Sequence, residues 1–160
     1  MSAKRGGLVA LSLLALLGAL SVAVLSADVY CAADRGLLDR VLRGMEIEYT
    51  VAFDEKGDPV WTFTSSGITV TIVSYDESSP GRYASLLFYA GWDVETQVSL
   101  SEVNDWNSRS RFGRAYVDEM GDPTVELDLL LIGGVTAQTL EEYIEVFVAS
   151  VSDLGVALQL

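Results

Sequence analysis

Apolar residues recur at helical spacing in the stretch that follows Asp34. They lie three or four residues apart, as on the buried face of an amphipathic helix: Leu37, Leu38, Val41, Leu42 and Met45. Asp34 has the side chain of a good N-cap, and Gly44 lies near the end of the pattern. This spacing predicts that the folded part of the chain opens with a short amphipathic helix.

From Ile47 the pattern changes to short runs rich in Val, Thr, Ile, Tyr and Trp, which favour strands. Four such runs follow one another along the chain: 47–53, 60–64, 68–73 and 83–90. Turn-forming residues separate them, namely Gly57, Gly67 and the pair Pro80-Gly81. The runs therefore predict four consecutive strands of an antiparallel meander.

A second helix is predicted to begin after Ser99, because Ser99 and Glu102 have the spacing of a capping box. We expect it to run to about Arg111, and two further strands to follow over 114–118 and 124–132. Gly133-Gly134 then breaks the chain, and Thr136 can cap a final helix. The apolar stripe of that helix, which should lie across the sheet, consists of Leu140, Tyr143, Ile144, Phe147, Val148, Val151 and Leu154.

The predicted order of elements is α-β-β-β-β-α-β-β-α. Strands and helices segregated in this way indicate an α+β fold, in which an antiparallel sheet is flanked by helices. The chain has 160 residues, 50% of them hydrophobic, which suits one domain with a sizeable core. We assign that domain to 34–160.

The N-terminal segment has the pattern of a targeting signal, because Lys4 and Arg5 precede an uncharged apolar stretch over 8–25. We interpret 1–27 as a secretory signal peptide, which directs the protein to the periplasm or another extracytoplasmic compartment. Small residues allow cleavage after Ala23, Ser26 or Ala33. The alternative is a membrane anchor, since about 18 apolar residues are just enough to span a bilayer.

Residues 28–33 are expected to be a poorly ordered lead-in to the domain. They contain Cys31, the single cysteine of the chain, so no intrachain disulfide can form. Stability must therefore come from the hydrophobic core.

Charge is distributed unevenly along the sequence. Lys4 and Arg5 are two of the 10 basic residues, and no acidic residue precedes Asp28. From Asp28 onward, 8 basic residues remain against 23 acidic ones, a net charge of −15. Such a domain repels the phosphate backbone, so nucleic-acid binding is disfavoured. The simplest interpretation is a solvated surface, and the alternative is attraction of a basic partner or divalent cations.

The residue types that most catalytic and metal sites need are missing. The chain has no histidine, the commonest general base and transition-metal ligand, and one cysteine cannot build a zinc or iron–sulfur site. We expect no cofactor, no metal and no enzymatic activity. The alternative is a hydrolase that uses Glu102 and Asp105, which share a helix face. Capping by Glu102 and solvation of Asp105 explain both residues more simply.

One segment is repeated in the sequence. Residues 54–59 and 118–123 both read D-E-x-G-D-P, and each joins two predicted strands. We interpret both as hairpin turns, in which Gly takes a positive φ and Asp bonds its own backbone. The alternative is a calcium-stabilised structural domain, but the loop is too short, and its Gly wrongly placed, for an EF-hand.

The centre of the second predicted helix, Asn104-Asp105-Trp106-Asn107, consists of indifferent helix formers. Asn104 and Asn107 share a face, so their amides can lock the helix to strand backbone or an adjoining loop. Trp106 can either fill the core or serve as an anchor for a partner.

The chain resembles the YbjN-like proteins, which are described as bacterial sensory transduction regulators. The resemblance is clearest from about Gly67 to Leu154 and rests on an N-x-x-N helix, an R-F-x-x-A strand and a G-x-[ST] helix entry. These motifs are matched by Asn104 and Asn107, by Arg111, Phe112 and Ala115, and by Gly134 and Thr136.

This resemblance implies a fold similar to the type III secretion chaperones, which bind segments of other proteins and often form dimers. It implies no enzyme. The resulting hypothesis is an exported binding module, chaperone-like or regulatory, for a protein segment, with a homodimer as a further expectation. The candidate binding residues are Asn104, Trp106, Asn107 and Arg111. Further aromatic candidates, most of them expected in the core, are Trp61, Phe63, Phe88, Tyr89 and Trp92.

Overall fold

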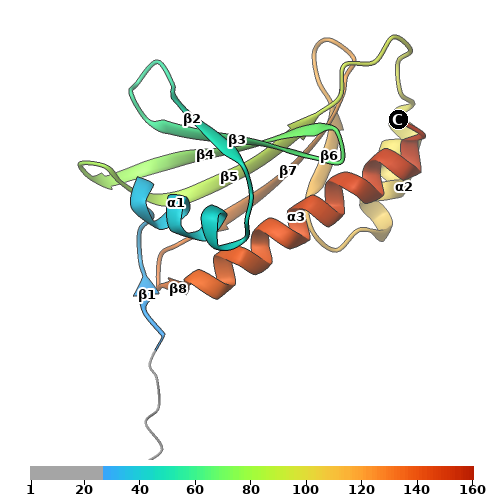
Figure 1. Ribbon diagram of the computed structural model, residues 1–160. Helices are drawn as coiled ribbons and strands as arrows, with labels where there is room; N and C mark the ends of the chain where they lie inside the picture. The colour runs from blue at the N-terminus through green and yellow to red at the C-terminus, as the bar shows by residue number, and fades with distance from the viewer. Residues whose placement is uncertain (1–26) are drawn as a thin grey trace, which may run out of the picture.

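The computed structural model describes residues 27–160, so the predicted targeting segment and its apolar stretch lie outside the described residues. The three helices lie on one face of a six-stranded antiparallel sheet (Figure 1). The helices are α1 (Arg35–Gly44), α2 (Leu100–Arg109) and α3 (Ala137–Leu158). The strands are β1 (Val29–Tyr30), β2 (Tyr49–Phe53), β3 (Pro59–Ser65), β4 (Ile68–Ser79), β5 (Arg82–Gly91), β6 (Arg114–Val117), β7 (Pro123–Leu130) and β8 (Val135–Thr136).

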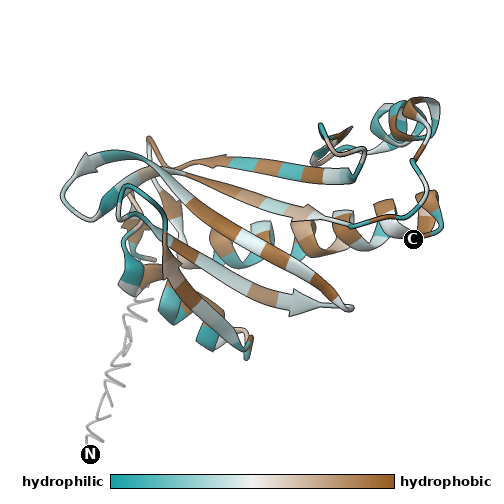
Figure 2. Cartoon of the chain, turned by 90° about the horizontal axis from the view of Figure 1, so that it is seen from above, coloured by the Kyte–Doolittle hydropathy of each residue, from teal (hydrophilic) through white to brown (hydrophobic). Residues whose placement is uncertain are grey.

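The large sheet has the order β2-β3-β4-β5-β7-β6. The first four of these strands form the predicted meander, and β2 and β6 are the two edges. Hydrophobic and hydrophilic positions alternate along several strands (Figure 2), as expected of a sheet with one buried face. Trp61, Ile72 and Phe88 are opposite one another on neighbouring strands, and all three are fully buried. The α+β fold predicted from the sequence is therefore confirmed.

Helix α3 crosses the buried face of the sheet (Figure 1). It begins after Thr136, whose hydroxyl accepts a hydrogen bond from the backbone N–H of Thr139 at 3.1 Å. Its predicted stripe is buried at Leu140, Ile144, Phe147, Val151 and Leu154 and half-buried at Tyr143 and Val148. Among the described residues, no helix is both long enough and apolar enough to cross a membrane.

The expectation that 28–33 is poorly ordered is wrong. Strand β1 pairs antiparallel with β8, and Ala33 exchanges two backbone hydrogen bonds of 2.8 Å with Tyr83 of β5. Ala32 and Ala33 are buried, whereas Cys31 is exposed. Two-residue strands are too short to show a period in sequence, which is why β1 and β8 were not predicted. Ordered structure therefore extends N-terminal of the domain predicted over 34–160, to about Asp28.

The two D-E-x-G-D-P segments form the same hairpin turn, as predicted. In each loop the side chain of the first Asp accepts hydrogen bonds from the backbone N–H groups two and four residues later. The glycines have positive φ angles of 89° at Gly57 and 93° at Gly121. The bonds join Asp54 to Lys56 and Asp58 at 2.8 Å, and Asp118 to Met120 and Asp122 at 2.9 Å.

The second Asp of each loop ties the hairpin to another segment. Asp58 accepts a hydrogen bond from the Tyr83 hydroxyl at 2.8 Å, and Asp122 accepts one from the backbone N–H of Val94 at 3.1 Å. Burial of Tyr83 and its hydrogen bond to Asp58 raise the pKa of the phenol to about 12. The Asp carboxylates in these loops thus have structural partners.

Candidate binding site

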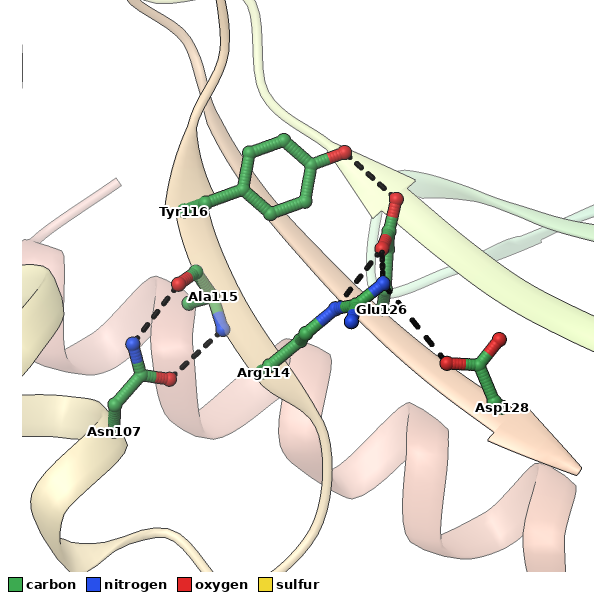
Figure 3. A network of polar contacts seen from close by, with 6 residues as sticks. All are labelled: Asn107, Arg114, Ala115, Tyr116, Glu126 and Asp128. Carbon is green, nitrogen blue, oxygen red and sulfur yellow. Dashed lines mark hydrogen bonds and ion pairs between the residues drawn. The ribbon is translucent and has the colours of Figure 1, made fainter.

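Asn107 attaches α2 to the edge of the sheet. Its amide Nδ2 donates to the backbone oxygen of Ala115 at 2.9 Å, and its Oδ1 accepts from the Ala115 N–H at 2.8 Å (Figure 3). Ala115 lies in the edge strand β6, so Asn107 takes the place of a neighbouring strand at this residue. The predicted locking of helix to sheet is therefore confirmed for Asn107.

Asn104 does not share this role. It is exposed, and its side chain makes no hydrogen bond to another described residue. The expectation that both amides lock the helix to the sheet is therefore wrong for Asn104, because the helix turns it towards solvent.

Trp106 belongs to the core, which decides between the two roles that the sequence left open. It is 2% exposed, and its Nε1 donates to Asp153 Oδ2 of α3 at 2.8 Å. Of the other aromatic candidates, Trp61, Phe63, Phe88 and Trp92 are also buried, and Tyr89 is half-buried. These side chains contribute mainly to the packing of the fold.

Arg111 lies at the mouth of a small hollow between α2 and α3. It is exposed, and its guanidinium carbon lies 5.1 Å from the centre of the Phe112 ring. The hollow has a volume of about 250 Å³ and is lined by Trp106, Ser110, Arg111, Phe112, Val146, Ala149, Ser150 and Asp153. Of the four predicted binding residues, Arg111 is thus the one that the structure leaves accessible beside a hollow.

A polar network on β6 and β7 lies next to Asn107 (Figure 3). Arg114 contacts Glu126 at 2.8 Å and Asp128 at 3.9 Å, and the Tyr116 hydroxyl donates to the other oxygen of Glu126 at 2.7 Å. Burial and this hydrogen bond raise the pKa of Tyr116 to about 12. Arg114 is 68% exposed, so the ion pair orders the edge of the sheet more than it stabilises the fold.

A larger hollow lies beside the middle of α3, where the connection between α1 and β2 passes over the end of β3. It has a volume of about 520 Å³. The apolar side chains that line it are Met45, Ile47, Phe63, Ile144 and Val148. The polar lining consists of three carboxylates, Glu46, Glu48 and Glu145, and of Thr64 and Ser65.

This hollow continues along α3. A second hollow of about 170 Å³ shares Ser65 and Val148 with the first and extends past Ile68 to Val156. We call the two together the α3 groove. Helix α3 lines it from Ile144 to Val156, a length of about 18 Å at the rise of an α-helix. Sequence reasoning missed this groove, because its walls come from segments that are far apart in the chain.

The acidic residues considered for catalysis are engaged or solvated. Glu102 accepts from the backbone N–H of Ser99 at 3.2 Å, which completes the predicted capping box, and Asp105 is exposed. Within residues 27–160, no group of three or more His, Cys, Asp or Glu is placed to hold a metal ion.

The chain is similar to one described family. The model of the YbjN family, described as "Putative bacterial sensory transduction regulator", matches residues 34–160. No curated protein matches the chain significantly. Neither this family description nor the solved structures below name an enzyme.

Three solved structures have a similar fold. The YbjN protein of E. coli superposes with a TM-score of 0.54 and 16% identity, over 73% of this chain and 84% of its own. The Yersinia pestis secretion chaperone SycH, solved with a fragment of YscM2, gives 0.53 and 16%, over 77% and 97%. SchA, in the HopA1-SchA chaperone–effector complex, gives 0.52 and 14%, over 78% and 92%. The chain therefore has the fold of type III secretion chaperones.

Proposed function

The chain belongs to the YbjN family, and from this premise we propose that it is an exported, non-enzymatic module that binds a segment of another protein. The observation that carries the proposal is the α3 groove, which is long, apolar and open to solvent at Val156. Apolar grooves are one of the recurring sites at which proteins bind amphipathic peptide segments.

Exposed apolar side chains support this role. Val156 at the end of the groove is 77% exposed, and Ile47 and Val148 are half-buried although they border the core. Apolar side chains left in contact with water along one groove gain free energy when a partner covers them. Two secretion chaperones of this fold were solved with other proteins, which makes a protein segment the first partner to test.

The place of action that we propose is the periplasm or another extracytoplasmic compartment. Support comes from Lys4 and Arg5 before the apolar stretch 8–25, which directly precedes the folded domain. Retention of that stretch would instead leave the same domain anchored to a membrane.

The proposal is tested by photo-crosslinking in the source cells. A photoreactive phenylalanine analogue replaces Val156 in the full chain, and a matched control carries it at Ile132, which is equally exposed at 76% but lies outside the groove. We expect one discrete adduct with another protein from position 156 and none from position 132. An adduct of twice the chain's mass would identify a second copy as the partner. No adduct at 156, or the same adducts at both positions, would contradict the proposal.

A further inference from the structure

We propose that the partner segment is basic and amphipathic, with Lys or Arg beside the apolar side chains that enter the α3 groove. This inference rests on the proposed function and names the chemistry of its partner. Its basis is the combination of an apolar floor with three carboxylates, Glu46, Glu48 and Glu145, at one end of the groove.

The floor of the groove requires an elongated apolar partner. Ile144, Val148 and Val151 recur along α3 at helical spacing, so they form one stripe along the wall. On the opposite wall lie Phe63 and Ile68, which belong to the hairpin of β3 and β4. A helical segment of about 12 residues has the length of this wall.

The acidic residues at the rim of the groove favour a partner that carries positive charge. Glu46, Glu48 and Glu145 are exposed, and none of them forms an ion pair with another described residue. Among residues 27–160, no Lys or Arg lines either hollow of the groove. Carboxylates grouped without a counterion repel one another, and a cationic partner relieves that repulsion.

Basic side chains of the described residues pair with a few carboxylates outside the groove. Asp39 is paired with Arg35, Asp34 with Arg82, and Glu126 with Arg114. The last turn of α3 also contains no basic residue, so the partial negative charge of the helix C-terminus adds to the field at the far end of the groove. With a net charge of −15 from Asp28 onward, the whole domain attracts a basic segment over longer distances.

The test uses two labelled synthetic peptides of about 14 residues, each with Leu at helical spacing. All remaining positions are Lys in one peptide and Glu in the other. Their affinities for the purified full chain are measured by fluorescence anisotropy. We expect the Lys peptide to bind at least about tenfold more tightly than the Glu peptide. Equal affinities, or tighter binding of the Glu peptide, would overturn the inference.

Two matched variants separate the groove from the overall charge. E46Q/E48Q/E145Q removes the acidic rim, and E55Q/E119Q/E142Q removes the same charge from exposed positions outside the groove. We expect the first to weaken binding of the Lys peptide at least about fivefold and the second to change it less than about twofold. An equal loss in both variants would show non-specific attraction and overturn the inference.

The outcomes also distinguish this inference from the proposed function. If position 156 gives a protein adduct in cells but the acidic rim does not affect binding of the Lys peptide, the partner chemistry is wrong and the binding module stands. If position 156 gives no adduct, the proposed function is wrong, regardless of the affinities measured for the two peptides.

Discussion

Asn107 is the side chain on which the attachment of α2 to the sheet edge depends. Its replacement in Asn107→Ala leaves the N–H and C=O of Ala115 without partners, and Ala115 is buried. An unsatisfied buried polar group costs about 1–3 kcal/mol. We therefore expect the free energy of unfolding, measured in urea, to fall by about that amount.

Asn104→Ala is the matched control in the same helix. Asn104 is exposed and unbonded to other described residues, so we expect a change within about 0.5 kcal/mol. If the two variants lost equal stability, the amide bonds of Asn107 would not be what holds the helix to the sheet.

Single residues were predictable where their partners are close in sequence. The caps at Asp34, Ser99 and Thr136 bond N–H groups only two or three residues away, so local spacing identified them. The role of Trp106 was not predictable, because Asp153, which accepts its hydrogen bond, lies 47 positions away. Sequence spacing likewise showed that Asn104 and Asn107 share a face but not that only Asn107 reaches β6.

The pairing of β1 with β8, which the sequence pattern did not predict, depends on Gly134. Gly133 and Gly134 both have positive φ, 91° and 96°, so alanine is strained at either position by about 1 kcal/mol. A methyl group at Gly133 meets open space, whereas at Gly134 it would clash with a methyl carbon of Val29 in β1. Gly134→Ala must therefore also displace the Val29 side chain of β1.

We expect Gly134→Ala to lower the urea midpoint more than Gly133→Ala. We also expect limited proteolysis to cut before Ala33 faster in Gly134→Ala than in Gly133→Ala, because β1 is no longer held against β8. Similar midpoints and similar cutting rates would mean that the contact with Val29 does not position β1.

The longer elements were predicted well because each has its own period. The amphipathic stripe of α3 and the alternating strands of the meander follow from residues within one element. Strand β4 runs further than predicted, to Ser79, because its second half is exposed and polar and so shows no apolar alternation. The two-residue strands have no period to detect.

At the scale of the whole molecule, the order of elements and the sheet covered by helices followed from the sequence, but the α3 groove did not. Its lining comes from 45–48, from the hairpin of β3 and β4, and from α3. Only the packing of these segments decides which apolar side chains remain open to water. The half-buried Val148, counted in sequence as part of the core stripe, is one such residue.

The start of the folded domain constrains where an exported chain can be cleaved. Removal of residues 28–33 by cleavage after Ala33 would delete β1 and both backbone hydrogen bonds between Ala33 and Tyr83. For the exported and cleaved protein that we propose, we therefore expect the mature chain, measured by intact mass, to begin before Asp28, as cleavage after Ala23 or Ser26 would produce.

The same argument predicts a difference between two shortened chains. The chain 28–160 should be more stable in urea than 34–160 by at least about 2 kcal/mol, since each lost backbone hydrogen bond costs about 1 kcal/mol and the burial of Ala32 and Ala33 is lost as well. Asp34 remains in both chains, so the side chain that caps α1 is retained and the difference reports mainly on the lead-in. Equal stabilities, or a mature protein that begins at Asp34, would show that β1 and its contacts are dispensable to the domain.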